Sequence, residues 1–210
     1  MKRLFPRTRL PEPRVPHPLM PRAEDTQIDL AAALTFALYA IEPRLHVGAH
    51  CARVAARLAW LAEVEGFGES ELRALVRAAE LHEVGMVAVP VELLENPDPL
   101  TPAELARIRA QAWIGAEIVR KTEGDLTAWL IQHQYTDYEV LRARFPVEST
   151  ELLLAGLFRV ADVTDALTEP RPYQRRLPEH RRLDVLFSGI GTRFHPEAVR
   201  ALVEAGPPPG

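Results

Sequence analysis

The sequence has little cysteine and almost no lysine. Cys51 is the only cysteine in 210 residues, which excludes an intramolecular disulfide framework and suits a reducing compartment. Lys2 and Lys121 are the only lysines, so arginine carries nearly all of the positive charge. The formal net charge of -4 and the pI near 6.0 exclude a general attraction to polyanions. We therefore expect no nucleic-acid polymer as a partner.

Long hydrophobic runs are also missing. The longest apolar stretch with helical character covers about residues 29–41, which is too short to span a bilayer, and Asp29 lies at its start. The first 25 residues contain six prolines and no apolar core of the kind found in secretory signals. These features predict a soluble cytoplasmic protein with no membrane partner.

Proline density divides the chain into parts. Residues 1–25 are predicted to form an extended or disordered arm, because prolines at this density disrupt helix and sheet alike. Residues 206–210, with the sequence GPPPG, form a short tail. Between them, apolar residues recur at helical spacing, and the predicted helices cover about 26–42, 49–66, 70–85, 101–121, 125–138, 150–168, 178–188 and 196–204. The prediction is one all-α domain at 26–205 with about seven to nine helices.

Capping and breaking residues indicate where some helices begin and end. Thr101 and Glu104 form the capping-box pattern, with Pro102 at the first helical position. Ser70 is a candidate N-cap, and Gly85 is expected to end the same helix. Residues 86–100 are predicted to be a loop because three prolines interrupt them, with short strands expected only near 87–89.

A few polar side chains stand on or beside otherwise apolar helices. His50, His82 and His133 lie there, and His82 is followed directly by Glu83, which pairs a nitrogen ligand with an oxygen ligand at a helix end. Asp162 and Asp165 lie three residues apart on one apolar helix face. Unpaired carboxylates in a core are costly, so they need arginine or helix-end partners, or a divalent metal. Asp165 is better explained as a structural hydrogen-bond acceptor than as a metal ligand.

Six blocks together resemble the HD-GYP family, a branch of the HD superfamily of metal-dependent phosphohydrolases. In order they read GAHCARVA, AAELHEVGMVAVP, LTPAELARIRAQAWIGAEI, LIQHQYTD, RVADVTDALTEPRPY and GTRFHPEAV, and they cover about residues 30–205. The resemblance implies a helical HD-type bundle and a metal site. The implied metal ligands are His50, His82, Glu83, His133 and Asp162. The implied catalytic carboxylates are Glu83 and Asp162.

The same resemblance implies that the site is degraded. The family's His-Asp pair falls on His82 and Glu83, and two further family histidines fall on Gln111 and Gln132. Amide oxygens replace imidazole poorly as transition-metal ligands. The family's glycine-lysine pair has become Gly85-Met86, and the Gly-Tyr-Pro signature is missing from the stretch DYEVLRARFPVEST.

Two functions follow from this comparison. The favoured one is a nucleotide-sensing or protein-interaction signalling module with little or no cyclic di-GMP phosphodiesterase activity. The alternative is an active phosphohydrolase with a reduced, mononuclear site. We expect at most one divalent transition metal, Fe, Mn or Zn, or none. The expected partners are a cyclic dinucleotide or another phosphate-containing ligand, a signalling protein, and a second copy of the chain in a homodimer.

One basic segment is a candidate for phosphate binding. Arg171, Arg175 and Arg176 lie in the block EPRPYQRR, and arginine forks bind phosphate well. A solvated basic turn explains the same segment equally well, so both interpretations stay open.

Overall fold

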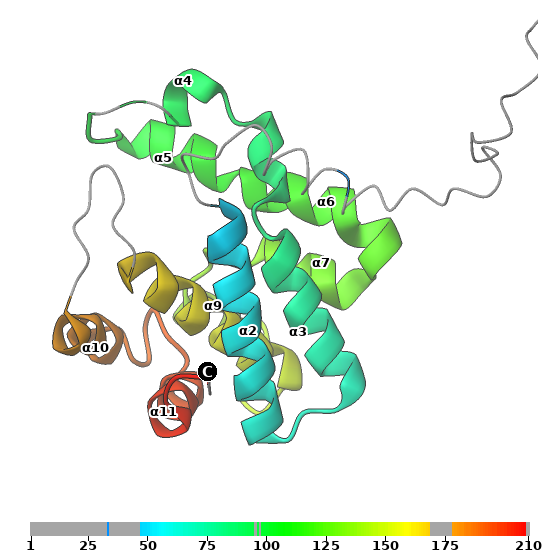
Figure 1. Cartoon of the computed structure of the whole chain (residues 1–210), viewed down its shortest axis with the longest axis vertical. Coiled ribbons are helices and arrows are strands. Elements are labelled where there is room, and N and C mark those ends of the chain that lie inside the picture. The colour runs from blue at the N-terminus through cyan, green and yellow to red at the C-terminus, as the bar shows by residue number, and fades with distance from the viewer. Residues whose placement is uncertain (1–32, 34–46, 95, 97, 169–177, 209–210) are drawn as a thin grey trace, which may run out of the picture.

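All regular structure in the described residues is helical. The computed structural model describes Ala33, residues 47–94, Asn96, and residues 98–168 and 178–208 (Figure 1). Its helices are α2 (Val47–Glu65), α3 (Glu69–Leu81), η1 (Val84–Ala88), α4 (Val91–Leu94), α5 (Pro102–Arg109), α6 (Gln111–Glu123), α7 (Asp125–Gln132), α8 (Tyr138–Arg142), α9 (Thr150–Thr168), α10 (Glu179–Ser188) and α11 (Pro196–Ala205). An isolated bridge between Ile190 and Phe194 is the sole β-type pairing among them. The all-α prediction is confirmed.

Some predictions concern parts of the chain outside this description. The arm at 1–25 and nearly all of the helix expected at 26–42 lie outside the described residues. None of the described helices combines the length and the apolar character needed to cross a membrane.

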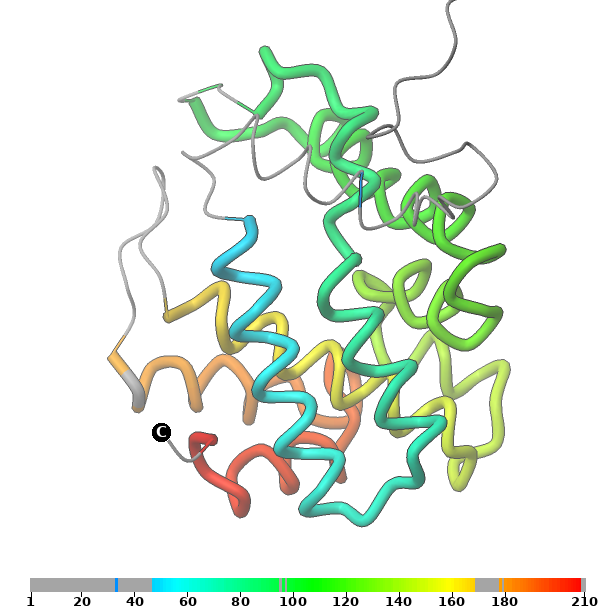
Figure 2. Tube along the Cα trace, turned by 45° about the vertical axis from the view of Figure 1, so that its right-hand side comes forward, coloured from blue at the N-terminus to red at the C-terminus, as the bar shows by residue number. Residues whose placement is uncertain are grey.

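Three long helices form the centre of the bundle. α2 and α3 run antiparallel beside each other, and α9 crosses behind α2, as Figures 1 and 2 show from two directions. Val54, Leu58 and Leu61 follow each other at spacings of four and three residues along α2, and all three are fully buried. Each such side chain contributes about 1.5–3 kcal/mol through burial, so this stripe fixes which face of α2 meets the core. The same stripe fixes the direction in which His50 points.

The connection between α3 and α4 differs from the sequence prediction. Residues 84–88 form the 3₁₀ helix η1, so the strand expected near 87–89 and the continuous loop expected over 86–100 are both wrong. No partner strand lies beside this apolar strip in the described residues. Its backbone is satisfied locally instead, by bonds from Met86 N to Glu83 O (2.9 Å) and from Val89 N to Met86 O (3.0 Å).

Helix ends were predicted with mixed success. The capping box of Thr101 and Glu104 is present, with Pro102 at the first position of α5. The helix predicted over 101–121 is divided at Ala110 into α5 and α6. Together with the unpredicted short helices α4 and α8, this brings the number of α-helices in the described residues to ten. α3 is capped by Gly68 rather than Ser70, and it ends at Leu81 rather than Gly85. His82 and Glu83 therefore lie in the turn between α3 and η1.

Gly85 allows η1 to approach the start of α6 very closely. A Cβ atom at this position would lie 2.0 Å from the carbonyl oxygen of Gln111 and 2.8 Å from the amide nitrogen of Gly115. Both neighbours are backbone atoms, so neither can rotate away. This contact places Glu83 next to Gln111.

We predict that Gly85→Ala lowers the free energy of unfolding by about 2 kcal/mol or more, because the added methyl group forces α6 away from η1. For a chain of this size, the melting temperature should fall by at least about 5 °C. The comparison variant is Gly68→Ala, where the added Cβ would meet only the carboxyl end of the flexible Glu71 side chain. Because Gly68 is the N-cap of α3, we expect a loss of about 1 kcal/mol or less there, smaller than at Gly85. Thermal unfolding followed by circular dichroism tests both variants. A melting temperature of Gly85→Ala equal to that of the wild type would contradict the role given to Gly85.

Candidate metal centre

Three helices bring two histidines and an aspartate together inside the bundle. His50 lies in the first turn of α2, His82 directly follows α3, and Asp162 lies on α9. Their exposed fractions are 6%, 0% and 8%. A carboxylate buried to this extent is expensive unless positive charge or hydrogen-bond donors compensate it. We refer to His50, His82 and Asp162 as the HHD group.

The ligand atoms of the HHD group lie at distances suited to one metal ion. The Nε2 atoms of His50 and His82 are 3.2 Å apart, and Asp162 Oδ1 lies 3.2 Å from the first and 3.8 Å from the second. Donors about 2.1 Å from a tetrahedral zinc ion are about 3.4 Å from one another. The three atoms therefore fit a single transition-metal ion without rearrangement.

Hydrogen bonds at the opposite ring nitrogens determine which atoms face the centre of the group. His50 Nδ1 lies 2.7 Å from Asp165 Oδ2, and His82 Nδ1 lies 2.7 Å from the carbonyl oxygen of Ala79. Since these oxygens accept, both Nδ1 atoms donate, and both Nε2 atoms turn lone pairs towards each other. Two lone pairs at 3.2 Å repel unless a cation or a proton lies between them. Ring orientation by a carboxylate or a carbonyl is the usual support for a metal-binding histidine.

Asp165 supports the HHD group from outside. It accepts hydrogen bonds from Arg53 Nε (2.7 Å) and from the terminal NH2 group of Arg53 (2.9 Å), in addition to the bond from His50. Burial raises the pKa of Asp165, but His50 and Arg53 outweigh it and lower the pKa to about 2. Asp165 thus stays ionised and orients the His50 ring, as the sequence predicted for a structural acceptor.

Glu83 lies at the edge of the group, where a fourth ligand would bind. It is half-buried, with Oε1 3.6 Å from His82 Nε2, while Oε2 accepts a hydrogen bond from Gln111 Nε2 at 3.3 Å. Gln111 is fully buried, and its Nε2 also donates to the hydroxyl of Tyr135 at 3.0 Å. Turning the amide would place its oxygen against the Glu83 carboxylate, so the amide nitrogen faces Glu83.

His133 is not brought into the HHD group. It follows the end of α7, where Nδ1 lies 3.2 Å from Thr136 Oγ1 and the ring centre lies 4.8 Å from that of Trp129. Burial and the charge of Arg144 lower the pKa of His133. The neighbouring Gln134 approaches the group instead, because its Nε2 donates to the carbonyl oxygen of His82 at 3.0 Å.

The remaining sequence-predicted residues are not all described. Arg171, Arg175 and Arg176 lie outside the described residues. Sequence reasoning also passed over Arg159, which lies three residues before Asp162 on α9 and donates to the carbonyl oxygen of Gln134 at 3.2 Å. The position of Arg159 one helical turn before a predicted ligand was the signal that could have identified it.

The HHD group should release a proton when it binds a metal at neutral pH. Burial lowers the pKa of His50, but its hydrogen bonds to the Asp162 and Asp165 carboxylates outweigh burial and raise the pKa to about 9. Burial also lowers the pKa of His82, but Cys51, Glu83 and Asp162 outweigh burial and raise it to about 9. Because the two Nε2 atoms are 3.2 Å apart, the two rings share one proton at pH 7, which the metal must displace. Metal affinity should rise with pH up to about 9, whereas the stabilisation of the metal-free protein by this proton, complete below pH 6.5, should disappear over that interval.

Calorimetric titration with Zn²⁺ in buffers of different ionisation enthalpy measures this proton. We expect about one proton released per metal at pH 7 and almost none above pH 9.5. Asp165→Asn is the informative variant, because loss of one carboxylate lowers the pKa of His50 and should reduce the release at pH 7. Metal binding without proton release at pH 7 would contradict the protonated state.

A buried group of two histidines and one aspartate, brought together from three separate parts of a helical bundle, has the arrangement of a metal-binding site. The family described as "HD domain" matches residues 47–167, a range that contains the entire HHD group, and the chain belongs to this family. The resemblance drawn from the sequence motifs is therefore confirmed.

Several curated proteins are similar to the chain. The "3'3'-cGAMP-specific phosphodiesterase 2" of Vibrio cholerae is 30% identical over 79% of this chain and 33% of its own length. The "Cyclic di-GMP phosphodiesterase response regulator RpfG" of Xanthomonas campestris is 30% identical over 68% of the chain and 39% of its own length. A "Cyclic di-GMP phosphodiesterase" of Thermotoga maritima is 28% identical over 70% and 42%. The matched region thus spans between a third and somewhat under half of these relatives.

Proposed function

We infer that the chain is a nucleotide-sensing HD domain that binds one divalent transition metal and a cyclic dinucleotide, with little or no cyclic di-GMP phosphodiesterase activity. The cyclic dinucleotide is proposed because similar proteins are named as phosphodiesterases of such nucleotides. The metal is proposed because of the geometry of the HHD group. The proposed ligands are His50, His82 and Asp162, with Glu83 as the fourth. His133, the fifth ligand that the resemblance implies, lies outside the group whose ligand atoms are gathered in the structure.

The hydrogen bond from Gln111 to Glu83 carries the proposal of weak activity. Where an enzyme with two metals needs a second electron-pair donor, this chain presents an amide N–H group 3.3 Å from the Glu83 carboxylate. An N–H donor repels a cation. Among the described residues, the HHD group is the one cluster of His, Cys, Asp or Glu with metal-binding geometry. Both observations favour one metal rather than two.

A second candidate function is hydrolysis with a single metal. The HHD group and Glu83 together provide four ligands, which is sufficient for one ion. A bound metal would supply Lewis-acid charge to a phosphoryl oxygen. In this alternative, Asp162 helps to hold the ion, and Glu83 Oε2, which also accepts the hydrogen bond from Gln111, would accept a proton from the attacking water.

Cyclic di-GMP binding and turnover separate the two candidates. The chain is purified without chelators, loaded in turn with Mn²⁺, Fe²⁺ and Zn²⁺, and tested for binding by calorimetry and for hydrolysis by chromatography. We expect binding, with turnover far below the rate of about 1 per second of ordinary enzymes. Turnover at that rate or above would support the single-metal enzyme and overturn the sensor. Absence of binding would favour the protein-interaction module with a signalling partner.

The part of the proposal that concerns Arg171, Arg175 and Arg176 is testable by the same binding assay. We expect these arginines to contact phosphate of the bound nucleotide, because guanidinium groups form paired hydrogen bonds with phosphate oxygens. The combined change of all three to glutamine should weaken cyclic di-GMP binding and leave the metal content unchanged. An unchanged affinity would identify this segment as a solvated turn.

A further inference from the structure

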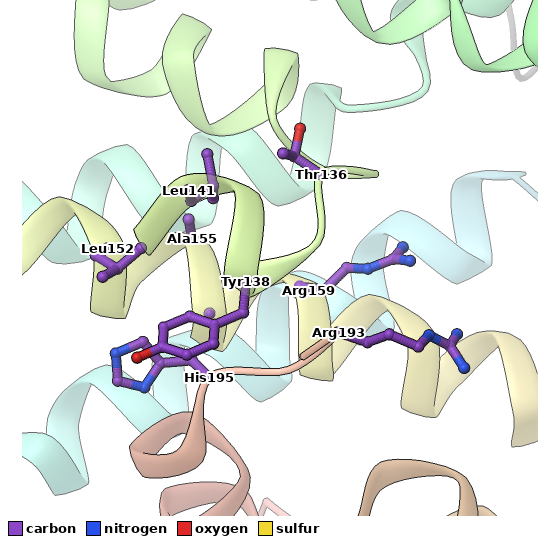
Figure 3. Close-up of a pocket in the computed structure, with 9 residues that line it drawn as sticks. Thr136, Tyr138, Leu141, Leu152, Ala155, Arg159, Arg193 and His195 are labelled. Atoms are coloured by element: carbon purple, nitrogen blue, oxygen red, sulfur yellow. The ribbon is translucent and has the colours of Figure 1, made fainter. Parts of the chain in front are cut away.

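Three arginines gather beside the HHD group. Arg159 lies on α9 three residues before Asp162, so the two side chains leave neighbouring positions on the helix. Arg193, in the segment leading into α11, lines the same pocket as Arg159, and Figure 3 shows both side chains extending in the same direction. Arg109 ends α5, with its guanidinium carbon 5.9 Å from the ring centre of Tyr135.

Arg159 has an unmet hydrogen-bonding requirement. One terminal NH2 group donates to the carbonyl oxygen of Gln134 at 3.2 Å, but its Nε is buried without a partner. Burial lowers the pKa of Arg159, and the charges of Arg193 and Arg109 also lower it, against the opposing charges of Asp162 and Asp137. An anion placed between these guanidinium groups would satisfy the buried donor and relieve the repulsion.

Among the described residues, none of these three arginines forms a direct ion pair, although the charges of Asp162 and Asp137 act on Arg159 from further away. Elsewhere on the surface, Arg77, Arg120 and Arg200 each pair with one or more glutamates or aspartates. Within the described part of the chain, by contrast, no carboxylate lies at ion-pair distance from Arg109, Arg159 or Arg193. Arg193 packs over the Phe194 ring at 5.1 Å.

Gln134 connects the arginines to the metal ligands. Its carbonyl oxygen accepts from Arg159, and its side-chain amide donates to the carbonyl oxygen of His82. A group bound by Arg159 therefore lies close to the HHD group. Guanidinium groups form short paired hydrogen bonds with phosphate oxygens, which makes a phosphoryl group the anion that this arrangement suits.

We propose that Arg159, Arg193 and Arg109 form a phosphate-binding site beside the HHD group and hold a phosphoryl group of the nucleotide ligand. The identity of the ligand as a nucleotide rests on the proposed function, whereas the anion site does not. This site is separate in sequence from the predicted phosphate-binding segment at Arg171, Arg175 and Arg176. The proposed site draws its three arginines from α5, from α9 and from the segment before α11.

The test compares phosphate affinity among three charge-matched variants of the full chain loaded with Mn²⁺. Arg159→Gln and Arg193→Gln remove one guanidinium each from the proposed site. Arg107→Gln is the control, because Arg107 is exposed on α5 and its side chain leaves the helix about 200° away from that of Arg109. Calorimetry measures the dissociation constants of two probes, cyclic di-GMP and inorganic phosphate, and elemental analysis measures bound manganese.

We expect each variant of the site to raise both dissociation constants on the order of 10-fold with manganese unchanged, and the control to behave as wild type. Unchanged constants in both variants, or an equal loss in Arg107→Gln, would overturn the site. If Arg159→Gln does not fold, Arg193→Gln decides, because its side chain is exposed. Wild-type protein that binds phosphate but not cyclic di-GMP would refute the nucleotide sensor while leaving the anion site testable. Binding of neither probe would refute the site.

Discussion

Asp162→Asn is expected to reduce bound metal from about one ion per chain to almost none. Asp162 supplies the sole carboxylate oxygen of the HHD group, within 3.2 Å and 3.8 Å of the two histidine Nε2 atoms. Asparagine keeps the shape but removes the charge that compensates a cation in this buried place. Mutation of residues that hydrogen-bond to metal ligands typically lowers metal affinity by about 10–100-fold. Loss of a direct anionic ligand should therefore weaken metal binding by more than about 100-fold.

Two control variants make this result specific. Asp184→Asn changes the same charge at an exposed position on α10 and should retain the metal. Asp165→Asn should retain the metal with an affinity lowered by about 10–100-fold, because Asp165 orients His50 without reaching the ion. Elemental analysis after dialysis measures metal content, and circular dichroism verifies the fold. Wild-type metal content in Asp162→Asn would remove Asp162 from the site.

The parts of the fold that the sequence predicted are those with strong periodicity or specific end signals. α9 occupies the predicted range 150–168, and its apolar residues repeat over five turns. The capping box at Thr101 was predicted because two side chains satisfy the first backbone N–H groups of the helix locally. The break at Ala110 was missed, since it has no proline or glycine and lies where η1 packs against α6. Tertiary contact determined that boundary.

The candidate site shows the same division between local and tertiary causes. His50 and Asp162 lie within long helices, so helical periodicity predicted that both point inwards. His133 lies one residue beyond α7, where the chain turns and its side chain packs on Trp129 instead. The periodic pattern does not apply after a helix ends. In the same turn after α7, the side chain of Gln134 points inwards and donates to the carbonyl oxygen of His82. The amino-acid composition alone did not indicate this contact.

If the chain holds at most one metal, as we propose, histidines in place of Gln111 and Gln132 should allow it to bind more than one. Glu83→Asp alone restores the shorter carboxylate, but Gln111 still turns an N–H group towards it, so metal content should stay at or below about one per chain. In the triple variant Glu83→Asp, Gln111→His, Gln132→His, imidazole at position 111 replaces the amide next to residue 83. Imidazole at position 132 is added at the end of α7. Metal content should then rise towards about two, because imidazole binds transition metals far better than a neutral amide.

Elemental analysis after equal loading of wild type, Glu83→Asp and the triple variant measures this gain. Two metals in the wild type would contradict the degraded site, since the Gln111 amide would then have to turn its oxygen towards a cation beside Glu83. No gain in the triple variant would mean that the backbone at 111 and 132, and not only the side chains, has moved out of range. The position of Gln111 bears most directly on whether the side chains or the backbone prevent binding of a second metal. Its Nε2 lies 3.3 Å from Glu83 Oε2 and its Oε1 is buried without a partner, so the side chain already occupies the place a second ligand needs. A polar side chain therefore already lies within reach of the carboxylate, so under the proposed function the amide chemistry of Gln111, rather than its position, is what would exclude a second ion.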